Sequence, residues 1–280
     1  MAQTFSLLRD WQTFLEAQGK VNPNTQKQYL RGVITALAVV VKPLSEWTEA
    51  DVMAVLAATT TRGGYRDQTL KSIQSFFRWY AKHGGHDPTA DFYVKKKRSG
   101  PPDYLSRTDL EALFVAAEDV DPRARPTLEL MYGTAARIGS IVELRPSDID
   151  QNARTVSFVL GVKNGATYAL PLGPRAWSAA LRLLELSDYV PRYGKRRPDK
   201  LVGVSEERVR QWMRTAGAAA GIALRVYPHL LRHTALTYLS RDPEVSVATI
   251  VQAANWQDPT PWKRYVAPRQ RDVVEAVSRL

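Results

Sequence analysis

A basic segment rich in proline and glycine divides this chain into two parts that have different hydrophobic patterns. Residues 93–103 combine a run of four cations with Ser-Gly-Pro-Pro, a composition typical of a linker between domains. Residues 1–92 show helical spacing throughout, whereas residues 104–280 mix helical spacing with strand-like alternation. The sequence therefore predicts a mostly α fold with a small β-sheet, built from a helical domain, a linker and a mixed α+β domain.

The N-terminal part carries the start signals of several helices. Asn22 is a candidate N-cap with Pro23 at the first helical position, and Thr48 precedes two acidic residues of a first turn. A further helix is predicted over 67–82. The apolar residues of the first helix recur at helical spacing, as Phe5, Leu8, Trp11 and Leu15.

The C-terminal part is predicted to hold a hairpin between helices. Residues 106–117 are amphipathic, and the long apolar stretch 125–144 predicts a buried pair of helices. Residues 155–172 alternate like two strands that turn at Lys163-Asn164-Gly165. Helices are also predicted in 175–190 and 205–221, with a basic loop between them, and the remaining chain is predicted to be helical.

The charge of the chain favours a polyanionic partner. It has 39 Lys and Arg against 28 Asp and Glu, a net charge of +11 and a sequence pI near 9.8. An excess of this size favours association with nucleic acid. Cysteine is absent, which excludes disulfides, thiolate metal sites and a cysteine nucleophile. We expect no membrane partner and a cytoplasmic location, because no apolar run approaches a membrane span and no signal peptide is evident.

Five residues of the C-terminal part suit the cleavage of a DNA strand without a metal ion. A guanidinium binds a phosphodiester through two parallel hydrogen bonds. A phenol can attack phosphorus, while an ammonium and an imidazole can give or take protons. The five residues are Arg137, Lys163, His229, Arg232 and Tyr265, and Trp256 lies between the last two in sequence.

Each of these residues also has an ordinary structural alternative. Arg137 lies in an apolar stretch and could snorkel or pair with Glu143. Lys163 could be a surface lysine of a turn, and Tyr265 is one of 12 tyrosines. The polar sequence around Tyr265 favours an accessible phenol, whereas Tyr238 lies in an apolar pattern typical of a core position.

His229 and His233 have the i,i+4 spacing of a helical zinc site. Leu230 occupies the position of the glutamate in an H-E-x-x-H motif, and Arg232 would repel a metal cation. We therefore predict no metal and no cofactor, and we interpret His233 as a structural histidine.

Four segments together resemble the signature segments of the tyrosine recombinase (phage integrase) family. They are "YGTAARIGSIVELRPSDID", "GVKNGATYALPL", "YPHLLRHTALTYL" and "ANWQDPTPWKRYV". The N-terminal "NPNTQKQY" and "TLKSIQSFFRWYAKHG" resemble the core-site-binding domain of that family. The resemblance covers nearly the whole chain, and the layout is similar to Xer-type recombinases or the simpler phage integrases.

The resemblance implies a role for each candidate catalytic residue. It implies that Arg137 and Arg232 clamp the scissile phosphate. It implies that Lys163 protonates the leaving 5′ oxygen and that His229 binds the phosphate and can take the tyrosine proton. Trp256 stands where many members have histidine and some have tryptophan, and Tyr265 would form a 3′-phosphotyrosine.

The sequence departs from the family pattern in two places. The acidic residue usually found three positions after the first arginine is Ser140 here, and Glu143 lies one helical turn further. The additional N-terminal arm-site-binding domain of lambda-type integrases is not evident, so we expect a two-domain layout.

The resemblance also predicts the partners and the assembly. We expect double-stranded DNA with paired inverted-repeat core sites, bound by a homotetramer. The C-terminal oligomerisation tail would present an apolar stripe made of Val273, Val274, Val277 and Leu280. The candidate DNA-binding cations lie on the predicted helices, the linker and the basic loop, as Lys27, Arg31, Arg62, Arg66, Lys71, Lys95, Lys96, Lys97, Arg98, Lys195, Arg196 and Arg197. A charge run such as 95–98 could instead be only a solvated linker.

The predicted function is site-specific DNA recombination through a 3′-phosphotyrosine and a Holliday junction, in integration, excision or resolution. Two alternatives remain open from the sequence. One is a DNA nicking and relaxing enzyme similar to a type IB topoisomerase, and the other is a non-catalytic DNA-binding regulator.

Overall fold

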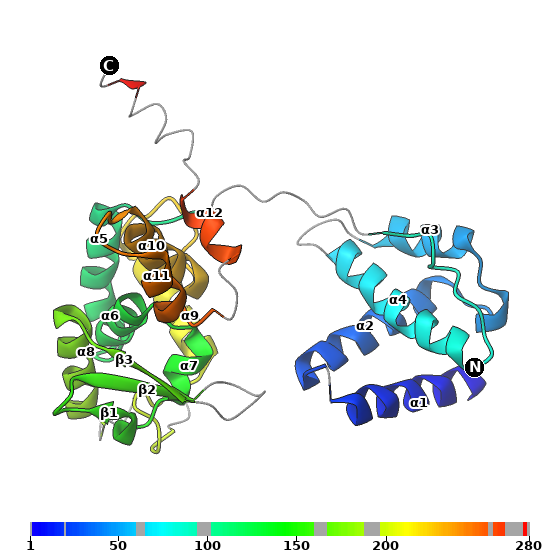
Figure 1. The fold of residues 1–280 in the computed structure, drawn as a ribbon, viewed down its shortest axis with the longest axis horizontal. Coiled ribbons are helices and arrows are strands. Elements are labelled where there is room, and N and C mark those ends of the chain that lie inside the picture. The colour runs from blue at the N-terminus through cyan, green and yellow to red at the C-terminus, as the bar shows by residue number, and fades with distance from the viewer. Residues whose placement is uncertain are drawn as a thin grey trace. The chain divides into compact units, whose positions relative to one another are not determined.

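The computed structural model describes residues 2–19, 21–59, 65–93, 102–159, 167–187, 197–256, 260–266 and 277–278. The chain divides into two compact units, Met1–Arg98 and Ser99–Leu280 (Figure 1). Within the part of the chain so described, no helix has both the length and the apolar character needed to cross a membrane.

All the secondary structure in the described residues of the N-terminal unit is helical, as the sequence predicted. Its elements are α1 (Ala2–Gln18), α2 (Pro23–Val39), a 3₁₀ turn (Leu44–Glu46), α3 (Glu49–Ala58) and α4 (Tyr65–Lys82). The predicted N-cap is confirmed, because Oδ1 of Asn22 accepts the backbone N–H of Thr25 at 2.9 Å. The start predicted at Thr48 is also confirmed, with Asp51 accepting the backbone N–H of Thr48 at 2.7 Å.

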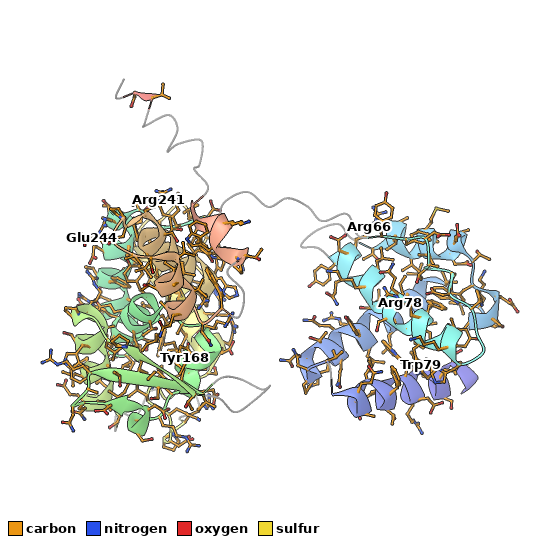
Figure 2. The ribbon with its side chains drawn as sticks, in the orientation of Figure 1. Arg66, Arg78, Trp79, Tyr168, Arg241 and Glu244 are labelled. Atoms are coloured by element: carbon orange, nitrogen blue, oxygen red, sulfur yellow. The ribbon has the colours of Figure 1, made fainter. Side chains whose placement is uncertain are left out.

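The α2 and α4 helices pack closely against each other in the N-terminal unit. A Cβ at Gly32 on α2 would lie 2.4 Å from Oγ of Ser72 on α4, so the two backbones approach each other where a side chain is missing. Trp11 from α1 packs its ring edge-on against Phe76 of α4, with ring centroids 5.3 Å apart. This core leaves the polar side of α4 exposed, and Figure 2 shows Arg66 and Arg78 on that helix.

The C-terminal unit places a small sheet among helices. The helices are α5 (Arg107–Glu118), α6 (Ala124–Thr134), α7 (Ile138–Glu143), α8 (Pro174–Glu185), α9 (Glu206–Ala219), α10 (Pro228–Arg241), α11 (Val247–Ala253) and α12 (Lys263–Val266). The three-stranded antiparallel sheet has the order β1 (Ile149–Asp150), β2 (Thr155–Val159) and β3 (Thr167–Pro171). The strands β2 and β3 pair in the register Phe158↔Tyr168, and the turn that carries Lys163 lies outside the described residues.

The start of this unit is fixed to α10 by two hydrogen bonds. The backbone N–H of Leu105 donates to Oγ1 of Thr234 at 2.9 Å, and the hydroxyl of Tyr238 donates to the Leu105 carbonyl at 3.1 Å. Because a buried backbone group needs a partner, these bonds hold the first residues of the unit against α10. Tyr238 thus serves the packing of this helix, as its apolar surroundings in the sequence indicated.

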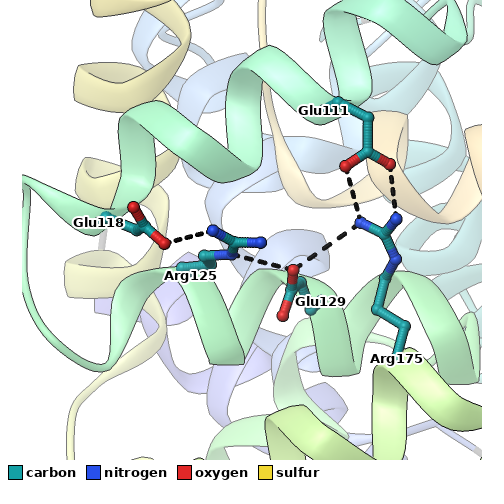
Figure 3. A network of polar contacts seen from close by, with 5 residues as sticks. All are labelled: Glu111, Glu118, Arg125, Glu129 and Arg175. Atoms are coloured by element: carbon teal, nitrogen blue, oxygen red, sulfur yellow. Dashed lines mark hydrogen bonds and ion pairs between the residues drawn. The ribbon is translucent and has the colours of Figure 1, made fainter.

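A network of ion pairs joins α5, α6 and α8 (Figure 3). Arg175 makes a bidentate contact with Glu111, at 3.0 and 2.6 Å. Nε of Arg125 donates to the mostly buried Glu129 at 3.0 Å, and Arg125 also pairs with Glu118. The carboxylates of Glu129 and Glu118 raise the pKa of Arg125. The network ties α5 and α8 to α6, the helix that ends at Ala135.

Candidate active site

The guanidinium of Arg232 lies at the centre of the site and is held by two backbone carbonyls. It sits one turn inside α10, is 6% exposed, and donates to the carbonyls of Ala135 and, at 2.7 Å, of Ala254. Ala135 ends α6 with φ 48°, and Asn255, the residue after Ala254, also has φ 48°. Residues other than glycine rarely adopt this left-handed conformation. Two left-handed turns therefore aim their carbonyls at one arginine, and the strained conformation of Ala135 in one of them is of a kind that clusters at functional sites.

The site has a net positive field. Burial, and then the positive charge of Arg137, lower the pKa of Arg232 to about 10. Among the described residues no acidic side chain pairs with Arg232. The remaining N–H donors of this buried cation can therefore be satisfied by an anion such as a phosphate.

His229 lies one helical turn before Arg232 and is exposed. Partial desolvation, together with the charges of Arg232 and Arg137, lowers the pKa of His229. The neutral imidazole is therefore favoured at neutral pH, so one ring nitrogen can donate a hydrogen bond to a phosphate oxygen. Arg137 itself is the exposed N-cap residue of α7.

Tyr265 is packed beside this positive centre. Its side chain is 7% exposed and belongs to a small apolar cluster with Ala135, Leu236 and Ile250. The indole of Trp256 stacks on its ring, with centroids 5.5 Å apart and planes at 29°. The sequence predicted an accessible phenol, and the structure instead buries it. In the described residues Tyr265 contacts α10, which also carries Arg232 and His229.

The sequence left open that Arg137 pairs with Glu143, and the structure shows other partners for this glutamate. Glu143 forms ion pairs with Arg197 at 2.7 Å and Lys200 at 3.0 Å, and these partners lower the pKa of Glu143 although its desolvation opposes the shift. The carboxylate is thus engaged on the far end of α7. The pairing of Arg137 with Glu143 is therefore not the arrangement that the structure shows.

Some of the predicted site residues lie in the described part of the chain and others lie outside it. Arg137, His229, Arg232, Trp256 and Tyr265 all lie in the described C-terminal unit, and the interactions above bring them together. In the N-terminal unit, Lys27 and Arg31 on α2 and Arg66 and Lys71 on α4 are exposed. The residues outside the described part are Lys163, Arg62, Lys95, Lys96, Lys97, Arg98, Lys195 and Arg196.

Sequence reasoning missed two groups of polar residues at the site. A cavity of about 490 Å³ beside His229 is lined by Arg210, Arg214, Arg225 and Tyr227. Tyr168 on β3 is half-buried and lies in the field of Arg232 and Arg137, while desolvation raises its pKa. Both groups depend on tertiary packing, and the only signal in the sequence was the density of arginine on α9. No cluster of three or more His, Cys, Asp or Glu able to hold a metal ion occurs among the described residues.

Comparison with known proteins places this site in a family. The model of the phage integrase family matches residues 103–271. A tyrosine recombinase XerC of Corynebacterium efficiens is 30% identical over 222 residues, covering 75% of this chain and 70% of the relative. A tyrosine recombinase XerA of Thermococcus onnurineus is 26% identical over 239 residues, covering 83% of this chain and 80% of the relative.

Solved structures show the same fold. A lambda integrase (residues 75–356) dimer bound to a COC′ core site has a TM-score of 0.76 at 18% identity, covering 95% of this chain and 96% of that chain. A lambda integrase tetramer bound to a Holliday junction has a TM-score of 0.74 at 17% identity, covering 92% of this chain and 79% of that chain. The chain belongs to the phage integrase family, and its relatives place it among the tyrosine site-specific recombinases.

Proposed function

We propose that the chain cuts and rejoins double-stranded DNA at specific sites through a 3′-phosphotyrosine on Tyr265 and a Holliday junction. The observation that carries this proposal is the phenol of Tyr265 packed beside a buried arginine that has no acidic partner among the described residues. A phosphodiester supplies the missing negative charge, and the phenol supplies the nucleophile.

Each group has one task in the proposed reaction. Arg137 and Arg232 bind the non-bridging oxygens of the scissile phosphate, and His229 donates a hydrogen bond to the same group. The hydroxyl of Tyr265 gives its proton to an imidazole of α10 while its oxygen forms a bond to phosphorus, and the bond from phosphorus to the 5′ oxygen breaks. Lys163 then gives its proton to the 5′ oxygen. The phosphotyrosine ester conserves the bond, so a 5′ hydroxyl of a second strand can attack it in reverse.

Trp256 acts on the nucleophile and not on the phosphate in this proposal. Its indole covers one face of the Tyr265 ring, which restricts the phenol to the apolar cluster between α10 and α11. Restricting a nucleophile lowers the entropy that is lost on reaching the transition state.

The DNA contacts are proposed for both units. Exposed cations on α2 and α4 of the N-terminal unit would bind backbone phosphates, together with the linker run at 95–98. In the C-terminal unit, the arginines of the cavity beside His229 would bind a phosphate that flanks the scissile one. Arg197 already pairs with Glu143, so binding of DNA by Arg197 requires an exchange of partners.

We propose a homotetramer on paired inverted-repeat sites, since strand exchange joins two duplexes at four cleavage positions. A structural relative is a tetramer bound to a Holliday junction, which supports this assembly. The tail would connect the subunits through its apolar stripe. Of that stripe, Val277 is described and is 60% exposed, whereas Val273, Val274 and Leu280 lie outside the described residues. A DNA-acting enzyme of this kind would work in the cytoplasm.

One assay separates recombination from the two alternatives. The protein first selects a duplex from a random-sequence pool, and two copies of that duplex are placed on one supercoiled plasmid. We expect deletion or inversion of the DNA between the copies, with Tyr265→Phe as the inactive control. Relaxation of any plasmid without exchange would indicate the topoisomerase-like activity, and binding without any strand break would indicate a regulator. The similar proteins described above are named recombinases and integrases, which favours the first outcome.

A further inference from the structure

The second histidine of α10 makes a direct contact with the phenol of Tyr265. Nδ1 of His233 lies 2.8 Å from Oη of Tyr265, and the two ring centroids are 5.7 Å apart. His233 is half-buried and Tyr265 is almost fully buried. A hydrogen bond at this distance in such surroundings fixes the phenol oxygen relative to α10. The interpretation of His233 as a purely structural histidine does not account for this contact with the phenol.

The two histidines of α10 face different parts of the site. Their rings are neighbours on one helical face, with centroids 6.0 Å apart. His229 lies at the exposed end, where it lines the cavity with the three arginines. His233 lies one turn deeper, against α12 and the nucleophile. Their positions separate contact with the phosphate from contact with the phenol.

We propose that His233 orients Tyr265 and accepts its proton during strand cleavage, so that His229 serves only the phosphate. This inference rests on the proposed function of Tyr265 as the nucleophile. The phenol donates to Nδ1 in the Nε2–H tautomer. As the bond from Oη to phosphorus forms, the phenol proton moves to Nδ1 and gives an imidazolium. The bond to the 5′ oxygen breaks at the same time, and that oxygen takes a proton from Lys163.

Charged and titratable groups lie on α10 and on the elements around it. Arg232 and His229 lie on its own helix, Arg137 precedes α7, and Tyr168 lies on β3. The elements packed on α10 also carry titratable residues, Arg125, Glu129 and Tyr132 on α6 and Lys263, Arg264 and Tyr265 on α12, whereas α11 has none. A bound phosphate brings negative charge beside these cations, which favours the imidazolium that forms when His233 takes the proton.

A spectrum of the free protein tests the contact itself. The chain has four histidines, so ¹⁵N–¹³C spectra of the imidazoles give four ring systems, with that of His233 assigned by its loss in His233→Asn. We expect an unprotonated Nδ1 at His233, and a change of its shift in Tyr265→Phe. The ring of His83, which contacts the carbonyl of Trp79, serves as the control and should not change. A His233 resonance that is the same in wild type and Tyr265→Phe would overturn the proposal.

Single-turnover cleavage of the selected duplex tests the proton transfer. Asparagine at position 233 keeps a polar atom near the place of Nδ1 but cannot accept the proton. We expect His233→Asn to cleave about 10²-fold more slowly and to lose the rise of rate with pH between about 5 and 8. His229→Asn should slow cleavage but keep that rise. A His233→Asn rate within about twofold of wild type, or an unchanged pH profile, would refute the assignment.

A nucleophile that needs no base provides the rescue. Difluorotyrosine at position 265 ionises at lower pH than tyrosine, so it should restore most of the rate of His233→Asn at pH 8. It should not rescue Arg232→Ala, whose defect lies in binding the phosphate. Absence of rescue in His233→Asn would assign the histidine to packing alone. If His233→Asn does not fold, His233→Gln takes its place, and the spectrum of the free wild-type protein still decides on the contact. Wild-type protein that forms no adduct with the selected duplex would refute the proposed function itself.

Discussion

Trp256 stacks on Tyr265 at a centroid distance of 5.5 Å, and the phenol thereby lies between an indole and α10. The stacking explains why tryptophan suits this position. A histidine there could bind the phosphate, whereas the indole packs on the phenol ring. The broad face of the indole covers the ring of the nucleophile, while the hydroxyl oxygen of the phenol contacts His233. The geometry assigns positioning of Tyr265 to Trp256 and leaves phosphate binding to the cations.

The arginine clamp gives the first prediction. Arg137→Ala and Arg232→Ala should each reduce the rate of single-turnover cleavage by roughly 10²-fold or more. Each substitution removes hydrogen-bond donors that stabilise the negative charge developing on the phosphate in the transition state. Binding of the selected duplex should change much less, since many other contacts share it. The pKa of Arg232, about 10, lies above neutral pH, so the clamp should stay charged up to about pH 8.

The control for the clamp is Arg232→Lys, which keeps the charge. It should still lose activity, because an ammonium cannot reach the Ala135 and Ala254 carbonyls and the phosphate in the same geometry. An equal loss of binding and cleavage in all three variants would instead mark these arginines as folding or positioning residues.

Lys163 gives the second prediction, since it is the proposed donor to the leaving group. Lys163→Ala should cleave normal DNA slowly, because the 5′ oxygen leaves poorly without a proton. A duplex with sulfur in place of the bridging 5′ oxygen should be cleaved by Lys163→Ala at nearly the wild-type rate. Equal defects on the two duplexes would show that Lys163 is only a surface lysine of the turn.

The helical unit gives the third prediction, through the salt dependence of DNA binding. Replacing Lys27, Arg31, Arg66 and Lys71 by glutamine should weaken binding to any duplex. It should also reduce the slope of log K against log salt by up to about 0.9 for each phosphate that the protein no longer neutralises. Arg9→Gln, which removes an exposed cation from α1, is the matched control and should leave the slope unchanged. A slope that is the same in wild type and in the variant with all four substitutions would show that these cations do not contact DNA.

The sequence predicted most of the local structure of this chain. Asn22 with Pro23 marked the start of α2, and the alternation in 155–172 marked the paired strands β2 and β3. These features depend on neighbours in sequence, through capping and side-chain periodicity. The start of α4 differed by two residues, at Tyr65 and not Asp67, because a polar first turn carries little periodic signal.

The contacts that build the site could not be predicted in the same way. The left-handed turn at Ala135 has no glycine to indicate it, and it is held by Arg232, which is 97 residues away. His233 and Tyr265 meet because α12 packs on α10 across 32 residues. Spacing alone placed His233 on the same face as His229, but it could not show which side chain each histidine touches.

Trapping of the covalent intermediate tests the central claim most directly. Wild-type protein and Tyr265→Phe are incubated with the selected duplex, which carries a nick close to the cleavage position so that the released strand diffuses away. Loss of only the phenol oxygen should leave binding intact, so we expect a protein–DNA adduct with wild type and none with Tyr265→Phe. Mass spectrometry should place the DNA on Tyr265. An adduct with Tyr265→Phe, or one attached to the exposed Tyr227, would contradict the account.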